Sequence, residues 1–148
     1  MKLDEAIQNR RSIRKFNTKK PDWRDIIECI DVARYAPMAG NNYTLRFILI
    51  DDKEKIQKIA KAAQQDFVSQ AKYVVVVCSN PSKTTNTYEK GEIFCRQQAG
   101  AAIQNFLLKI ERAKIKENIN ENKMIVLYSA RKKSPPIIEA TPVPPLNL

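Results

Sequence analysis

Hydrophobic residues recur at helical spacing in four segments of the chain, and this spacing predicts four helices. The predicted helices cover residues 2–10, a segment from residue 23 towards Pro37, residues 54–64 and residues 92–113. In the second helix the apolar stripe begins at Trp23, so we expect this indole side chain to lie in the core. Asp22 directly precedes the stripe and belongs to the residue types that cap helix N-termini.

Three apolar runs predict β-strands, over residues 45–50, 73–78 and 124–128. The second run contains four consecutive valines, which is typical of a strand covered on both faces. Residues 80–88, which follow it, are polar and are predicted to be a linker. Helices thus alternate with a small number of strands, so the pattern predicts an α/β or α+β fold.

Proline is concentrated at the C-terminal end, where it makes up five of the last fourteen residues. Proline lacks a backbone N–H, so such a segment cannot form a helix or a central strand. We therefore divide the chain into a folded domain of residues 1–133 and an extended arm of residues 134–148.

Composition excludes several kinds of enzyme. The chain has 148 residues, 43 % of them hydrophobic and 28 % charged, which suits one globular domain. It has no histidine, which excludes Ser-His and Cys-His nucleophile pairs and histidine-bearing metal sites. The three cysteines lack metal-ligand spacing, so we predict no metal site and expect small buried side chains in a reducing compartment. The three glycines lie far apart, so a glycine-rich phosphate loop is excluded as well.

The chain shows no membrane or export signal. Its longest apolar run, Tyr73–Cys78, is too short to span a bilayer, and the first residues carry acids where a signal peptide has an apolar core. We expect a cytoplasmic protein without a membrane partner.

The densest group of functional side chains directly follows the first predicted helix. It consists of Arg10, Arg11, Ser12, Ile13 and Arg14, which place three guanidinium groups and one hydroxyl within five residues. Guanidinium groups bind phosphate oxygens bidentately, and a serine adds a short donor. The segment can therefore serve as an anion clamp made of side chains. On composition alone, a solvated basic turn is the alternative interpretation.

The order of motifs along the chain resembles the nitroreductase family of FMN-dependent oxidoreductases. The matching motifs are Arg-Arg-Ser-x-Arg-x-Phe at 10–16, Ala-Pro with Ala-Gly-Asn at 36–41, Arg-Phe at 46–47, Gln-x-Phe at 65–67 and Ala-Ala-Ile-Gln-Asn-Phe-Leu-Leu at 101–108. Their order and spacing match the family over roughly residues 2–112.

The resemblance implies an α+β fold, a three-layer sandwich with a central, mostly antiparallel sheet, in an intertwined homodimer. Residues 1–133 would form the FMN-binding domain, and the arm of residues 134–148 would wrap the partner. Electrons would pass from NADH or NADPH through FMN to a nitroaromatic, quinone or similar acceptor. No side chain is required as a catalytic acid or base, which fits a chain without histidine.

The resemblance also assigns residues to the cofactor. Arg10, Arg11 and Ser12 stand where the family holds the FMN phosphate and ribityl chain, with Ile13 in the same run. Arg14 stands where a cation lies near the N1 and O2 edge of the flavin, where it stabilises the negative charge of the reduced ring. The loop that approaches the ring from the other subunit contains Pro37, Met38 and Asn41.

Several positions depart from the family pattern. The family's Gln-Pro-Trp is replaced by residues 43–45, its Pro-Ser serine by Met38, and the aspartate that opens the long-helix motif by Gln98. Some 15 to 20 residues that pack against the flavin are missing after Lys114, where residues 115–119 resemble the family's next helix. A catalytically impaired dimer that binds flavin weakly or not at all is therefore the alternative.

The net positive charge of the chain suggests a different class of function, nucleic-acid binding. A formal net charge of +10 suffices for non-specific attraction to nucleic acid. The basic residues are spread over the chain and few aromatic side chains accompany them, so we expect no nucleic-acid partner.

Overall fold

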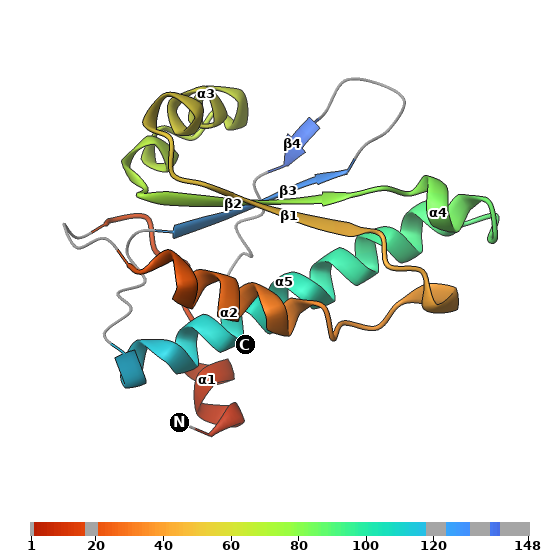
Figure 1. The fold of residues 1–148 in the computed structure, drawn as a ribbon, viewed down its shortest axis with the longest axis horizontal. Coiled ribbons are helices and arrows are strands. Elements are labelled where there is room, and N and C mark those ends of the chain that lie inside the picture. The colour runs from red at the N-terminus through yellow and green to blue at the C-terminus, as the bar shows by residue number, and fades with distance from the viewer. Residues whose placement is uncertain (1, 17–20, 118–123, 131–136, 140–148) are drawn as a thin grey trace.

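A four-stranded β-sheet lies at the centre of the molecule (Figure 1). The structure is a computed structural model that describes residues 2–16, 21–117, 124–130 and 137–139, with side chains up to residue 113 apart from that of Lys83. The strands are β1 (Leu45–Ile50), β2 (Tyr73–Ser79), β3 (Met124–Ala130) and β4 (Ile137–Glu139), in this order across the sheet. β2 and β3 are parallel, whereas β1 with β2 and β3 with β4 are antiparallel. The expected mostly antiparallel sheet is confirmed.

All three strands predicted from the sequence are present. β1 has the predicted bounds, β2 extends one residue beyond Cys78, and β3 extends two residues beyond Tyr128. β4 lies within the predicted arm and pairs at the edge of the sheet, where a strand flanked by prolines is tolerated. The other residues of that arm lie outside the described residues.

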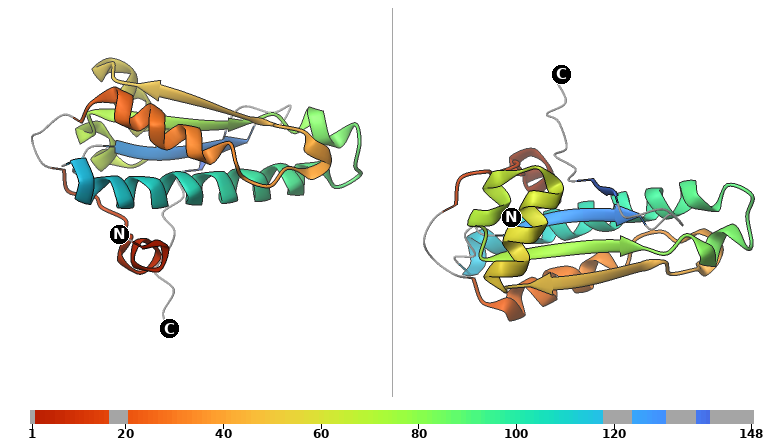
Figure 2. Two further views of the ribbon diagram at one scale, coloured as in Figure 1. Left: turned by 60° about the horizontal axis from the view of Figure 1, so that its bottom comes forward. Right: turned by 90° about the horizontal axis from the view of Figure 1, so that it is seen from above.

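Helices cover both faces of the sheet, which gives three layers (Figures 1 and 2). α2 and α5 pack on one face with α1 beyond them, and α3 lies on the opposite face together with the short helix η2. This arrangement confirms the α+β three-layer sandwich. The helices are α1 (Leu3–Asn9), α2 (Trp23–Ala33), η1 (Ala39–Asn41), α3 (Lys53–Ala63), η2 (Asp66–Gln70), α4 (Ser82–Thr85) and α5 (Gly91–Glu117).

The helix starts follow the capping residues. The Asp22 side chain accepts a hydrogen bond from the Arg24 backbone N at 2.9 Å, so the predicted cap of α2 is confirmed. Asp52 caps α3 in the same way, through Lys55 N at 2.8 Å. α3 therefore begins one residue earlier than predicted. It ends before Gln64, which adopts the left-handed conformation with φ of 54°.

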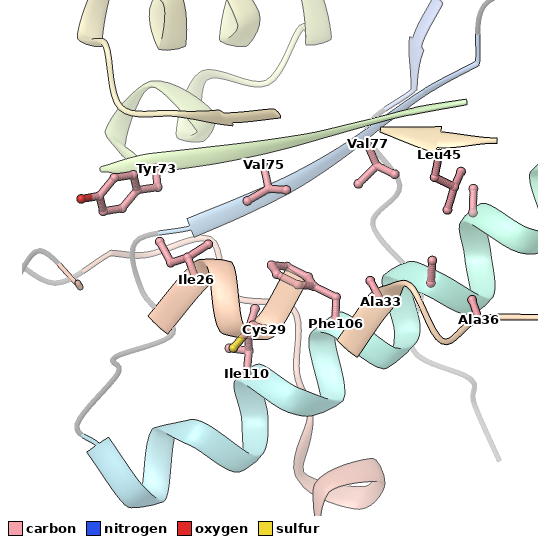
Figure 3. Close-up of a cluster of buried hydrophobic side chains, with 12 residues drawn as sticks. Ile26, Cys29, Ala33, Ala36, Leu45, Tyr73, Val75, Val77, Phe106 and Ile110 are labelled. Atoms are coloured by element: carbon pink, nitrogen blue, oxygen red, sulfur yellow. The ribbon is translucent and has the colours of Figure 1, made fainter. Parts of the chain in front are cut away.

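The larger hydrophobic core lies between the sheet and the pair α2 and α5 (Figure 3). From β2 it receives Val75 and Val77, from α2 Ile26, and from α5 Phe106, all of them at most 2 % exposed. A second core under α3 contains Val74 and Ile56. Alternate residues of a strand point to opposite faces, so the valine run of β2 supplies both cores. This confirms a strand covered on both sides.

Trp23 is not in the core, and that prediction is wrong. Its side chain is 50 % exposed, and the Arg24 guanidinium lies 5.3 Å from its ring centroid. The buried face of α2 consists of Ile26, Cys29 and Ala33, while Ile27 is also exposed. Periodicity identifies the apolar side of a helix, but it does not tell how much of that side the neighbouring elements cover.

Two predictions around the longest helix also need correction. Residues 80–88 are not only a linker, because α4 forms within them. α5 continues through residues 115–117, which were predicted to belong to a separate helix. The reason is local, since no glycine or proline occurs between residues 101 and 134 to end the helix. Within the described ranges, no helix combines the length and the apolar character needed to cross a membrane.

The contact between α4 and α5 depends on the absence of a side chain at Gly91. A Cβ atom there would lie 2.4 Å from the Thr84 carbonyl carbon and from the Thr85 N. Thr84 is buried at the same contact and shares a hydrogen bond with Cys95, with an oxygen–sulfur distance of 2.7 Å. The first turn of α5 is therefore closely fitted to α4.

We expect Gly91→Ala to lower the free energy of unfolding by about 1–3 kcal/mol, because backbone atoms must shift to admit the methyl group. Gly100→Ala is the matched control, since a Cβ there meets nothing within 4 Å. The control should be neutral or slightly stabilising, as alanine favours a helix interior. Urea unfolding measures both variants, and equal stabilities would contradict the close fit at Gly91.

An ion pair joins α2 to α5 on the surface of the larger core. Lys109 Nζ donates to Glu28 Oε1 at 2.6 Å. The hydrogen bond and the charge of Lys109 lower the pKa of Glu28, and the hydrogen bond from this carboxylate raises the pKa of Lys109. Both directions mean that the folded chain favours the charged pair.

The pair should make stability depend on pH in a defined direction. Because the pKa of Glu28 is lower in the folded chain, its contribution is present at neutral pH and is lost as the pH falls through the folded pKa. We expect Glu28→Gln to lower the urea midpoint at neutral pH and to differ less from the parent chain at about pH 3. If the urea midpoints of Glu28→Gln and the parent chain differ by the same amount at neutral pH and at about pH 3, the lowered pKa of Glu28 is contradicted.

Candidate functional site

The segment of residues 10–14, the clamp segment below, leaves α1 at its C-terminal end. The Arg10 backbone N donates to Ala6 O at 3.1 Å and closes the last turn of α1. Arg11 Nη1 donates to Gln8 O at 2.5 Å and to Arg10 O at 2.9 Å. Arg11 thus binds carbonyl groups at the end of the helix, a common role for arginine there. The sequence did not reveal this second role of Arg11.

The donors of the clamp segment are accessible. Arg11, Ser12 and Arg14 are exposed, and Arg10 is partly exposed. Within the part of the chain that the structure describes, the recorded ion pairs involve other arginines and lysines, not those of the clamp segment. A set of guanidinium groups and a hydroxyl that form no ion pair with a carboxylate of the described residues fits a phosphate group well.

Phe67 anchors the far end of the clamp segment. The Arg14 guanidinium carbon lies 5.9 Å from the Phe67 ring centroid, and Phe16 stacks on the same ring with centroids 6.5 Å apart. Phe67 belongs to η2 and packs against the core under α3. The clamp segment therefore runs from α1 to the α3 side of the sheet. The sequence motif at 65–67 marks Phe67, but its contact with Arg14 is visible only in the structure.

The second group of candidate residues lies in the turn between α2 and β1, called the loop of residues 37–41 below. Pro37 and Asn41 are exposed, and Met38 is partly buried just before η1. Gly40 and Asn41 both adopt the left-handed conformation, with φ of 58° and 56°. Glycine adopts this conformation freely and asparagine tolerates it, so the Gly-Asn pair suits this turn.

Tyr88 packs on the outside of this loop. A Cβ atom added to Gly40 would lie 2.7 Å from Tyr88 Oη, so the tyrosine ring covers the glycine closely. Phe94 meets the Tyr88 ring edge-on, with centroids 5.5 Å apart and an interplanar angle of 81°. Sequence reasoning placed Tyr88 in a linker and missed this contact, since nothing in the local pattern links residues 40 and 88.

The clamp segment and the loop of residues 37–41 lie at opposite ends of the molecule (Figures 1 and 2). The clamp segment lies at the end where α5 finishes, and η1 lies beside the first half of α5, near α4. α5 has 27 residues, and at the usual rise of 1.5 Å per residue such a helix is about 40 Å long. One chain therefore does not bring the two groups together, and a site made of both requires a second copy of the chain.

The side chains of the clamp segment and of the loop of residues 37–41 are suited to binding. In the described residues, no group of three or more histidine, cysteine, aspartate or glutamate side chains is placed to hold a metal ion. The donors of the clamp segment can hold an anion, and the loop of residues 37–41 offers backbone and amide groups. Redox chemistry at such a site would have to come from a bound cofactor.

Comparison with known proteins gives a consistent result. The profile of the nitroreductase family matches residues 7–77. A protein of Archaeoglobus fulgidus, provisionally named NADH dehydrogenase/NAD(P)H nitroreductase, is 31 % identical over 103 residues, which are 69 % of this chain and 57 % of that protein. The chain spans about half the length of the curated relatives that it matches, between 40 % and 57 %.

Solved structures show the same fold. A nitroreductase family protein from Clostridium novyi NT superimposes with a TM-score of 0.67 at 22 % identity, over 82 % of this chain and 79 % of that one. An NADPH:FMN oxidoreductase from Vibrio harveyi, solved with NAD+, gives a TM-score of 0.64 at 22 % identity, over 75 % of this chain and 52 % of that one.

Proposed function

The chain belongs to the nitroreductase family, and on this premise we propose that it is an FMN-dependent oxidoreductase that uses NADH or NADPH. The observation that carries the proposal is the accessible donor set of the clamp segment, which has no recorded carboxylate partner in the described residues. An NADPH:FMN oxidoreductase among the structures of the same fold supports the choice of cofactor.

Each candidate residue has a proposed part in holding FMN. Arg10 and Ser12 would hold the phosphate, with Arg11 beside them at the end of α1. Arg14, held against Phe67, would provide positive charge near the flavin ring. FMN bound there would supply the redox chemistry, which is acceptance of a hydride from NAD(P)H and transfer of two electrons to a nitroaromatic, quinone or similar acceptor. We assign no side chain as a catalytic acid or base.

A homodimer is part of the proposal, since the loop with Pro37, Met38 and Asn41 can reach a clamp segment only on another copy. Large apolar side chains are available for such an interface. They are exposed on three helices and comprise Leu3, Ile7, Trp23, Ile27, Ile93 and Phe94. Where such side chains adjoin one another, they are typical of a surface that another chain covers. We further propose residues 134–148 as the arm that reaches the partner, and residues 1–133 as the FMN-binding domain.

The cytoplasm is the proposed location. None of the three cysteines, all of which lie in the described residues, forms a disulfide, and Cys29 and Cys95 are buried. Cysteines that form no disulfide are usual in a reducing compartment.

An impaired dimer is the second candidate function. The observation behind it is the short connection between α5 and β3. α5 ends at Glu117, and β3 begins only seven positions later, at Met124. The family places an additional flavin-contacting segment here. Such a protein would form the dimer but hold FMN weakly or not at all.

Steady-state kinetics separate the two candidates. The full chain, saturated with FMN, is mixed with NADH or NADPH and a naphthoquinone, and loss of the nicotinamide absorbance is followed. The proposed oxidoreductase predicts turnover that depends on both FMN and the protein, above the rate of free FMN. Rates equal to those of free FMN, with a dimer present in sedimentation velocity, would favour the impaired dimer.

A further inference from the structure

Gln98 forms a buried contact with the end of the loop that precedes β1. Thr44 Oγ1 donates to Gln98 Oε1 at 2.5 Å, and the Thr44 backbone N approaches the same oxygen at 3.3 Å. Both side chains are 4 % exposed, and 54 positions separate them in the sequence. A hydrogen bond in such a dry environment holds its two partners firmly.

Thr44 is where the loop of residues 37–41 is tied to the fold. Its carbonyl oxygen accepts a hydrogen bond from the Asn80 backbone N at 2.8 Å, at the end of β2. Thr44 is thus bound to α5 through Gln98 and to the sheet through Asn80. Three residues earlier, the backbone turns through the left-handed pair Gly40 and Asn41.

The loop is held from two sides. Tyr88 covers Gly40 from outside, and Gln98 binds Thr44 from inside. Gln98 lies on α5, and Tyr88 lies just before this helix. The position of the loop is therefore fixed by contacts with α5 and the residues before it, although in the sequence the loop follows α2.

Of the two polar atoms of the Gln98 amide, only the oxygen forms hydrogen bonds in the described residues. Its Nε2 is buried and has no hydrogen-bond partner in the described structure. An unsatisfied buried donor is costly, so the glutamine is a poor choice for stability alone. The Gln98 oxygen, by contrast, accepts the hydrogen bond from the Thr44 hydroxyl and so holds Thr44 in place.

We propose that Gln98 is a positioning residue, which fixes the conformation of the loop of residues 37–41 through Thr44. The effect on FMN binding rests on the proposed function, whereas the effect on the loop does not. Gln98 itself would not touch the cofactor.

Four variants of the full chain test the proposal. Gln98→Met keeps the length of the side chain and removes the accepting oxygen, and Thr44→Val removes the donating hydroxyl. The double variant Gln98→Met with Thr44→Val removes both partners. Ile110→Val is the control for lost packing, because Ile110 is also buried on α5, about three turns further along the helix.

The first readout is amide hydrogen exchange of peptides that cover residues 36–44, measured without FMN. Gln98→Met and Thr44→Val should each speed this exchange about tenfold relative to Ile110→Val. The double variant should be no faster than Gln98→Met alone, because the bond from the Thr44 hydroxyl that Thr44→Val removes is one of the two that Gln98→Met removes.

The second readout is the dissociation constant for FMN, from flavin fluorescence. Gln98→Met should raise it about tenfold, and Ile110→Val should leave it unchanged. Exchange that rises equally in Gln98→Met and Ile110→Val overturns the proposal. A parent chain that binds no FMN overturns the proposed function instead, and the exchange data then decide the role of Gln98 alone.

Discussion

Phe106→Ala is expected to lower the free energy of unfolding by about 3–5 kcal/mol, the usual cost of truncating a fully buried phenylalanine. Phe106 is 0 % exposed and projects from α5 into the core that α2 and β2 also line (Figure 3). Removing the ring leaves a cavity between three elements, which cannot all move to fill it. Since domains of this size are stable by only about 5–15 kcal/mol, the loss should be easy to detect.

Urea unfolding of the full chain, followed by far-UV circular dichroism, measures this effect. Gln104→Ala is the matched control, since Gln104 is exposed on the same helix two positions away. The control should stay within about 0.5 kcal/mol of the parent chain. A Phe106→Ala variant as stable as the control would show that the core between α2, α5 and the sheet is wrongly described.

The double variant Arg10→Ala with Ser12→Ala is expected to weaken FMN binding about 100-fold or more. A hydrogen bond to a charged group contributes about 1.5–3 kcal/mol, and each factor of ten in affinity corresponds to about 1.4 kcal/mol. The variant removes a guanidinium group and a hydroxyl from the proposed phosphate contacts. Neither side chain is buried, so the fold should be retained.

Fluorescence titration with FMN measures the change. Arg24→Ala removes the same charge from an exposed site on α2, where the arginine is already paired with Asp22. It controls for the general effect of net charge and should change the affinity by less than about threefold, as expected for an exposed pair. Equal losses in both variants would mean that the basic charge of the chain, and not the clamp segment, attracts FMN.

Local sequence patterns predicted much of the fold. β1 has the expected bounds because a run of apolar residues ends at two aspartates. The cap at Asp22 and the buried valines of β2 also follow from short-range chemistry and from strand periodicity. The clamp segment was visible because three arginines and a serine are adjacent in sequence.

Other features depend on contacts between distant residues, which no local pattern contains. The exposure of Trp23 depends on how far neighbouring elements cover the first turn of α2. Likewise, the contact of Tyr88 with Gly40 and the bond of Gln98 to Thr44 each join residues about 50 positions apart. The proposed site between two copies of the chain also cannot be derived from local patterns, and at the sequence level only the family resemblance suggested it.

The most direct test of the central claim is the flavin content of the full chain after purification and exchange with excess FMN. Protein separated from free FMN by gel filtration is denatured, and the released flavin is measured against the protein concentration. The proposed function predicts a yellow protein with close to one FMN per chain. A colourless protein that retains no FMN would contradict it.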